Sequence, residues 1–373
     1  MFLTGAEEGW PESEQAALAR RILPEYMRLG PERFVANAGV EMRVVRAGDQ
    51  AIPVVWRNCE SWGGTPDVSS AWSHYVRYPL DEVARNGKGV GALLRRCLVY
   101  AGVPVLAASR IDEAVLVNNW LISTNPAPSL DRGELERLTG ELCKMFPGRA
   151  ILFRTVNPLL HRELAERLVA CGYQFVAGRV VYVLDPKSRE YQRSENARED
   201  RKMLYDGGYE IVAQEELTAA DMPRIAELHR MLYIEKHSRL NPKYTELFFE
   251  TASRNRFFEY QGLRKEGRIE GYVAWYEFDG LLVGSLVGYD TRLAKSSGLY
   301  RRCVALMMEE ARRRGIRLHL SAGAGAFKHH RGARPCVEYD AVFCRHLPVQ
   351  RRAGWDLLKT AGVLQHRKVR RGW

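Results

Sequence analysis

The chain has 373 residues, 46% of them hydrophobic, and its 56 Lys and Arg against 45 Asp and Glu give a formal net charge of +11. This length favours two domains, each able to bury a core. Because no run of about 18 uninterrupted apolar residues occurs, we expect no membrane span and no membrane partner. The N-terminus lacks the regions of a signal peptide, and seven scattered cysteines fit a reducing compartment, so the predicted location is cytoplasmic.

The first half of the chain alternates between strand-like and helix-like segments. The pattern predicts a helix over 11–29, a strand hairpin over 40–45 and 51–56, a loop over 61–70 and a helix over 80–100. It then predicts strands over 114–121, 150–156 and 173–184, with helices over 133–145 and 159–170 between them. Such alternation is typical of an α/β fold.

A polar stretch over 186–200 is expected to be a linker or a hinge helix. The order of elements then repeats, with a strand at 209–214, helices at 219–233 and 242–251, strands at 257–264, 268–278 and 281–290, a helix at 297–314 and a strand at 317–320. Thr218 is an N-cap candidate, and Asp279-Gly280 is a strong hairpin signal. Two diverged copies of one fold are the most economical account.

The most distinctive motif is the run from Ser321 to Ala333, which holds three glycines, four alanines, Lys328 and Arg331. It lies between two strand-like segments. Backbone amides of Gly-rich turns bind developing negative charge, and a nearby cation adds to the same effect. The plain alternative is a tight turn that carries two solvated cations.

Phe327-Lys328-x-x-Arg331-Gly332, followed by Glu338-Tyr339, resembles a segment of Fem-type acyltransferases, which have the GNAT (acyl-CoA N-acyltransferase) fold and often occur as tandem copies. Leu240–Tyr244, Gly288–Thr291 and Gly298–Arg301 are similar to a subgroup, the seryl-tRNA-dependent transferases of the valanimycin type. The resemblance covers residues 205–350 well and the first half only in pattern.

The resemblance implies an α/β (α+β) protein of two tandem GNAT-like domains, each a mixed, mostly antiparallel sheet flanked by helices. The expected boundaries are 1–190 for a degenerate first domain, 205–350 for a catalytic second domain and 351–373 for a basic C-terminal tail.

The same resemblance implies an active cleft where the sheet of the second domain splays, between 281–290 and 317–322. Lys328 would contact the donor or stabilise the tetrahedral intermediate, and Asp290 would accept a proton or position the nucleophile. The candidate catalytic residues are Lys328, Asp290, Tyr289 and Tyr339, and the candidate substrate-binding residues are Ser321, Gly323, Gly325, Arg331, Tyr300, Lys243 and Tyr244. The alternative, structural roles are a surface lysine for Lys328, a turn or N-cap residue for Asp290 and core residues for the tyrosines.

The identity of the donor depends on a missing motif. GNAT enzymes that use acetyl-CoA bind its pyrophosphate with Arg/Gln-x-x-Gly-x-Gly/Ala, but Thr291–Gly298 has one glycine and Ser123–Asp131 has none. The near match Asn86–Gly91 has asparagine in the cationic position. With no such loop in either copy, the resemblance implies aminoacyl-tRNA as donor and no tightly bound cofactor.

We therefore expect transfer of an aminoacyl group from aminoacyl-tRNA to an amine, hydroxylamine or hydroxyl of a small metabolite. The alternative is acyl-CoA-dependent N-acetylation of a small amine, and a third is a non-catalytic binding protein. The tRNA would contact Arg312–Arg314 and the tail cations Arg367, Lys368, Arg370 and Arg371. The sequence leaves the oligomeric state open.

The sequence lacks the motifs of two other kinds of site, a metal site and a serine hydrolase site. A Cys/His-rich patch between His319 and His346 lacks Cys-x-x-Cys and His-Glu-x-x-His spacing, so no metal site is expected. A serine hydrolase would need a Gly-x-Ser-x-Gly elbow, which the chain lacks.

Overall fold

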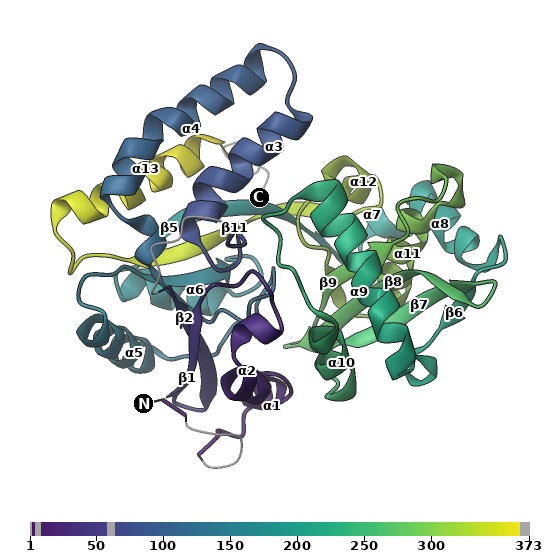
Figure 1. Cartoon of the computed structure of the whole chain (residues 1–373), viewed down its shortest axis with the longest axis horizontal. Coiled ribbons are helices and arrows are strands. Elements are labelled where there is room, and N and C mark those ends of the chain that lie inside the picture. Colours follow the sequence, from purple (N-terminus) through teal and green to yellow (C-terminus); the bar gives the residue numbers. More distant parts are fainter. Residues whose placement is uncertain (1, 4–8, 58–63, 366–373) are drawn as a thin grey trace. The chain divides into compact units, whose positions relative to one another are not determined.

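The structure is a computed structural model that describes residues 2–3, 9–57 and 64–365 (Figure 1). The chain forms two compact units. The first comprises the chain up to Arg179, Ser238–Pro242 and the chain from Val337 onward, and the second comprises Val180–His237 and Lys243–Cys336. The predicted fold class is confirmed, because each unit is a mixed, mostly antiparallel sheet flanked by helices.

The sheet of the first unit has the strand order β1-β2-β3-β4-β11, with the start of β5 beyond β11. Its strands are β1 (Glu41–Ala47), β2 (Gln50–Trp56), β3 (Val115–Val117), β4 (Ile151–Val156), β5 (Gln174–Leu184) and β11 (Arg334–Phe343). Its helices are α1 (Glu14–Arg20), α2 (Leu23–Leu29), α3 (Tyr78–Asn86), α4 (Val90–Ala108), α5 (Arg132–Met145), α6 (Arg162–Ala170) and α13 (Val349–Gln365). Leucines of α5 and α6 pack with Phe153 and other sheet residues into one core.

The sheet of the second unit has the order β10-β9-β8-β7-β6, with the end of β5 next to β10. Its other strands are β6 (Glu210–Val212), β7 (Glu259–Lys265), β8 (Arg268–Phe278), β9 (Leu281–Tyr289) and β10 (Arg317–His319). Its helices are α7 (Arg189–Gln192), α8 (Glu195–Tyr205), α9 (Met222–His229) with the π-helical segment Arg230–His237, α10 (Glu246–Arg254), α11 (Leu299–Arg314) and α12 (Gly325–His329). The buried face of α11, including Cys303 and Met307, packs with sheet residues such as Val273 and Leu282.

Two strands pass from one unit to the other. β5 begins in the first unit and ends in the second, and β11 does the reverse, so Val337–Phe343 belong to the first unit. The expected division at 190 and 205 therefore differs from the division that the structure shows. Of the two possibilities expected for residues 186–200, a linker or a hinge helix, the structure shows helix, since the stretch carries α7 and the first part of α8.

The expected basic tail over 351–373 needs correction. Residues up to Gln365 form helix α13, whose Trp355 is fully buried. The many basic residues of this segment suggested a tail, although one side of the helix is apolar and packs on the protein. The tail cations Arg367, Lys368, Arg370 and Arg371 lie outside the described residues.

Several local predictions are confirmed with refinements. The hairpin over 40–56 forms as β1 and β2, and Asp279 and Gly280 adopt the two positive φ values of a type I′ turn. Thr218 caps a 3₁₀ turn that leads into α9, in a capping box with Asp221. The helices expected over 11–29 and 80–100 are each two helices, and Gly89 adopts a φ of +74° at the start of α4.

One described helix, α4, is long and apolar enough to cross a membrane by length and composition alone. The sequence-based expectation of no span depended on the lack of an uninterrupted apolar run, and α4 is interrupted by Arg95 and Arg96. Most of this helix is exposed.

A buried ion cluster joins three helices of the second unit. Asp200 on α8 is 1% exposed and accepts hydrogen bonds from Arg301 of α11 at 2.7 Å and from Arg331, just after α12, at 2.5 Å. The guanidinium of Arg331 also lies 3.4 Å from the ring centroid of Phe327. Arg331 thus links the end of α12 to α8.

We expect Asp200→Asn to lower the free energy of unfolding by about 3 kcal/mol, because it leaves a buried guanidinium without its carboxylate. Urea unfolding would measure the change. Glu195→Gln is the control, because that exposed carboxylate is 3.6 Å from Arg198 and its loss should cost about 0.5 kcal/mol or less. Equal losses in both variants would contradict the role given to the cluster.

Candidate functional site

The candidate site begins at a parallel pair of strands in the second unit. β10 pairs with β9 in parallel, with Arg317 opposite Leu281 and His319 opposite Val283. The carboxyl ends of parallel strands lie at the same edge of a sheet, where open α/β folds bind ligands. β10 is followed at this edge by the turn 320–324 and then by α12.

Lys328, the leading catalytic candidate, is not the exposed turn lysine that the sequence suggested. It is 4% exposed, and its ammonium donates to three successive backbone carbonyls, those of Leu320 at 2.6 Å, Ser321 at 3.2 Å and Ala322 at 2.7 Å. The ammonium also lies 5.7 Å from the ring centroid of Tyr182. Lys328 therefore fixes the shape of the turn.

This contact sets the direction of the amides in the turn. Because a trans peptide holds its C=O and the next N–H in opposite directions, carbonyls that point at Lys328 turn the amides of Ser321, Ala322 and Gly323 away from it. Ser321 N donates to His319 Nδ1 at 3.2 Å. Left-handed φ values at Ser321 (+57°), Gly323 (+77°) and Ala324 (+48°) produce the tight bend.

The two predicted glycines of the turn have different reasons to be glycine. Gly323 has a positive φ, and a Cβ added there would have no neighbouring atom within 4 Å, so backbone conformation alone restricts it. At Gly325 the φ is ordinary, but a Cβ would collide with the hydroxyl of Tyr182. Both positions therefore support the shape of the turn.

Asp290, the predicted proton acceptor, follows β9 and is enclosed by arginines. Arg292 binds both its oxygens at 2.9 and 2.7 Å, and Arg224 of α9 donates at 2.8 Å. The hydrogen bonds from Arg292, with a further one from Arg224, hold the pKa of Asp290 well below its ordinary value although burial opposes them. A carboxylate stabilised in this way is a poor base, and Asp290 instead anchors the turn after β9 to α9.

A chain of aromatic contacts links the end of β9 to α12. The ring centroids of Tyr289 and Tyr300 are 6.2 Å apart, and those of Tyr300 and Phe327 are 4.9 Å apart. Lys236 donates to the Tyr289 hydroxyl at 2.8 Å. Burial, with smaller effects of Tyr233 and Tyr289, raises the pKa of Tyr300, so its phenol stays protonated.

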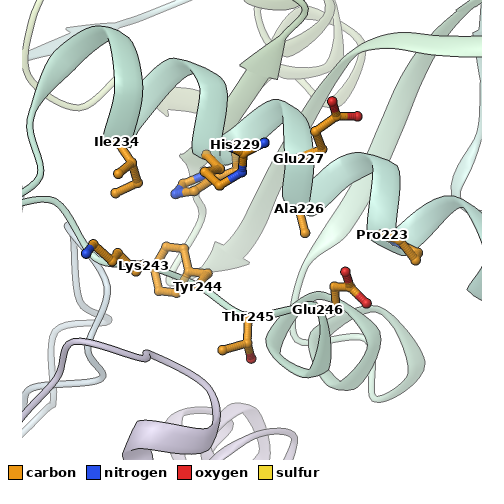
Figure 2. Close-up of a pocket in the computed structure, with 10 residues that line it drawn as sticks. Pro223, Ala226, Glu227, His229, Ile234, Lys243, Tyr244, Thr245 and Glu246 are labelled. Carbon is orange, nitrogen blue, oxygen red and sulfur yellow. The ribbon is translucent and has the colours of Figure 1, made fainter.

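The remaining candidates lie elsewhere. Tyr339 belongs to the first unit, where its ring centroid is 5.5 Å from that of Phe175. Lys243 and Tyr244 line a cavity of about 560 Å³ in the second unit, between α9 with its π-helical extension and the segment that begins α10. Figure 2 shows Lys243 and Tyr244 on the segment before α10, facing the helix that carries His229 and Ile234, and the ring centroids of Tyr244 and His229 are 5.1 Å apart.

This cavity contains residues that sequence reasoning missed. His229 is 2% exposed; its Nδ1 lies 3.1 Å from the Tyr272 hydroxyl, and its ring stacks on Tyr233 at 4.5 Å. Glu227 and Glu246 add carboxylates to the lining, and hydrogen bonding from Arg224 lowers the pKa of Glu227. A lone histidine in a helix gives no signal in the sequence, but the π-helical segment that follows it is frequent at functional sites.

The corresponding edge of the first unit is filled by its own chain. β3 pairs with β4 in parallel, and the segment after β3 is buried. Asn118 accepts from the indole of Trp120 at 2.9 Å, and Asn125 donates to Thr155 Oγ1 at 3.1 Å. Polar side chains of this segment thus pair with one another and with β4.

No metal site appears among the residues that the structure describes, since no group of three or more His, Cys, Asp or Glu side chains is placed to hold an ion. The Cys/His patch is dispersed: His319 lies on β10, whereas His346 lies 3.6 Å from Cys143 and Cys344 accepts from Gln174.

We expect Lys328→Met to lower the free energy of unfolding by about 3 kcal/mol, because three carbonyls lose the ammonium that satisfies them. Lys295→Met, which changes an exposed lysine in a 3₁₀ turn, is the matched control and should have little effect. Denaturant unfolding checks both. An unchanged stability for Lys328→Met would show that the ammonium does not hold the turn.

Comparison with known proteins shows a likeness in structure only. No protein-family model and no curated protein sequence matches the chain. The C-terminal domain of a protein described as a lysylphosphatidylglycerol synthetase from Agrobacterium fabrum superposes with a TM-score of 0.52 at 12% identity, over 94% of this chain and 98% of that one. L-PGS from Bacillus licheniformis gives a TM-score of 0.51 at 12% identity, over 95% of this chain and 99% of that one.

FemX gives a TM-score of 0.50 at 8% identity, over 86% of this chain and 90% of that one. Nothing in these comparisons supports the valanimycin-type subgroup, which remains an interpretation of the sequence. What the likenesses establish is the architecture: the chain shares its overall fold with FemX and with the lysylphosphatidylglycerol synthetase domains.

Proposed function

We propose that the chain is an acyltransferase whose donor site is the turn 320–324 of the second unit. It moves an aminoacyl group from aminoacyl-tRNA to an amine, hydroxylamine or hydroxyl of a small metabolite. The observation that carries this proposal is the placement of Lys328, which holds a bent, Gly-rich turn at the carboxyl end of the parallel pair β9·β10. The fold shared with FemX supports the class of reaction.

The chemistry requires stabilisation of the oxygen that becomes anionic in the tetrahedral intermediate. Lys328 binds the carbonyls of Ser321 and Ala322, so the N–H groups that follow them, those of Ala322 and Gly323, point away from its ammonium. These two N–H groups are the candidate hydrogen-bond donors to the anionic oxygen. In this account Lys328 is a positioning residue. Its positive charge lies behind the turn and its three protons are directed to backbone carbonyls.

The acceptor would bind in the cavity beside α9. Its volume, about 560 Å³, suits a small metabolite. Glu246 would attract a protonated amine, and Lys243 would bind an anionic group of the same molecule. Glu227 is already paired with Arg224 at 2.5 Å. His229 is better suited than Asp290 to remove a proton, because Asp290 is held as a carboxylate by two arginines.

The turn after β9 supports a donor other than acyl-CoA. Gly298, its last residue, has a φ of +65°, and a Cβ there would lie 2.7 Å from Met203 Sδ, so packing accounts for this glycine. Asp290 and Arg292 organise the start of the turn. Neither feature resembles a cradle for pyrophosphate.

The predicted tRNA contacts at Arg312–Arg314 need revision. Each of these arginines donates to a glutamate, Arg312 to Glu309, Arg313 to Glu310 and Arg314 to Glu277. Arginines that are already paired with glutamates are less suited to bind phosphate. We therefore propose that the tail cations, which lie outside the described residues, make the main contacts with tRNA.

To test the acid–base assignment, turnover would be compared in His229→Gln and Asp290→Asn. We expect His229→Gln to lower kcat by roughly 10²-fold or more, the usual contribution of a general base. Asp290→Asn should act mainly on stability, with a smaller effect on kcat. If Asp290→Asn lost more turnover than His229→Gln while both stayed folded, the assignment would be wrong.

To identify the donor, transfer would be assayed with charged tRNA and with acyl-CoA, each with and without ribonuclease. We expect ribonuclease-sensitive transfer from charged tRNA, and binding that weakens with salt at a slope of about −0.7 to −0.9 per neutralised phosphate. Changing Arg367, Lys368, Arg370 and Arg371 to Gln should flatten that slope.

Ribonuclease-insensitive turnover of acyl-CoA would establish the alternative, an acyl-CoA-dependent N-acetyltransferase acting on a small amine. Tight binding of either donor without turnover of any acceptor would favour the third possibility, a non-catalytic binding protein.

A further inference from the structure

Helix α4 of the first unit presents an apolar surface to solvent. Val90 is 83% exposed, Leu93 62%, Leu94 58% and Leu98 64%, whereas Ala92 and Leu106 are the buried residues of the helix. A helix that is apolar on most sides is normally buried in a core or in lipid. The surface formed by Val90, Leu93, Leu94 and Leu98 is here called the α4 face.

The charge within α4 and the segments that flank it in sequence has a single sign. No Asp or Glu occurs between Glu82 and Asp112, while Lys88, Arg95 and Arg96 lie within or just before the helix. Arg95 and Arg96 are exposed. Apolar side chains next to exposed positive charge are complementary to a surface that is apolar below and anionic above, which is the character of an anionic lipid bilayer.

Neighbouring elements fix α4 along one side. Figure 1 shows α4 beside α3 and α13, all in the first unit. A Cβ at Gly102 of α4 would lie 3.4 Å from Leu357 of α13, so the two helices pack closely there. α13 also exposes apolar side chains, Val349 at 67% and Val363 at 45%.

The helix is better suited to lie on a bilayer than to cross one. Its 19 residues span about 28 Å, enough to cross the hydrocarbon core. However, Arg95 and Arg96 lie well inside the helix, where a crossing would place two charges in the hydrocarbon, and Pro104 interrupts its hydrogen bonding. Packing on α13 also keeps one side of the helix on the protein.

We propose that the α4 face docks the first unit on an anionic membrane surface, with its leucines at the acyl boundary and Arg95 and Arg96 at the lipid phosphates. A second copy of the chain is a poorer occupant, because it would bring like charges together in a protein of net charge +11. The inference concerns binding and does not depend on the transferase activity proposed above.

The test is flotation of the full chain with vesicles of phosphatidylcholine alone and of phosphatidylcholine with phosphatidylglycerol. We expect binding to the anionic vesicles that weakens with salt. The double variant Leu93→Glu/Leu94→Glu should lower the bound fraction at least about tenfold, and Arg95→Gln/Arg96→Gln should remove the preference for anionic lipid.

The matched control is Leu159→Glu/Val169→Glu, which changes two apolar residues of the same unit that are 44% and 59% exposed and lie outside α4. It should bind as the unchanged protein does. Absence of binding to anionic vesicles, or an equal loss in the control, would overturn the proposal. A concentration-dependent dimer that Leu93→Glu/Leu94→Glu dissociates, without vesicle binding, would show that a second copy covers the face.

Discussion

The second unit is organised around one buried ammonium. Removing a charge from water is costly unless its hydrogen-bonding groups are satisfied, and Lys328 meets this condition with the carbonyls of Leu320, Ser321 and Ala322. The contact can form only if the chain bends sharply after β10. The left-handed residues of the turn, the ordinary φ at Gly325 beside Tyr182 and the start of α12 are all consistent with that bend.

Two sets of ion pairs support this contact. Arg331, three residues after Lys328, binds the buried carboxylate of Asp200, which also binds Arg301 of α11. Asp290 performs the same task on the other strand of the parallel pair, where it joins Arg224 and Arg292. Lys328 and Asp290, which were predicted to be catalytic, thus hold the strand ends in place. In their stead we propose backbone amides as donors to the oxyanion and His229 as the general base.

Patterns of local sequence predicted most elements of the fold. The strand hairpins at 40–56 and 268–290, the helix over 297–314 and the motif after β10 follow from alternation, helical spacing and turn residues. The sequence did not predict that β5 and β11 each run from one unit into the other. This property depends on which strands lie beside them, and a strand's own residues do not reveal its neighbours. The burial of Lys328 depends in the same way on carbonyls brought together only by folding.

Some errors had a signal in the sequence. Glu309 and Glu310 precede Arg312–Arg314 by three or four residues, the spacing at which helix side chains pair. These glutamates form ion pairs with the arginines that were expected to contact tRNA. The apolar content of residues 90–108 was visible despite Arg95 and Arg96. By contrast, Asp290 and Arg224 are 66 positions apart, and their contact has no local signature.

The two units differ at equivalent places. Each has a parallel pair of strands, β3·β4 or β9·β10, but in the first unit buried asparagines and Thr155 fill the edge, whereas in the second a braced turn lies there. The most direct test of the donor site is to react the protein with tRNA that carries a photoreactive aminoacyl group and to map the cross-linked peptide. Labelling within residues 317–334 is the predicted result. Labelling of residues 118–126 in the first unit, with none in 317–334, would contradict the account.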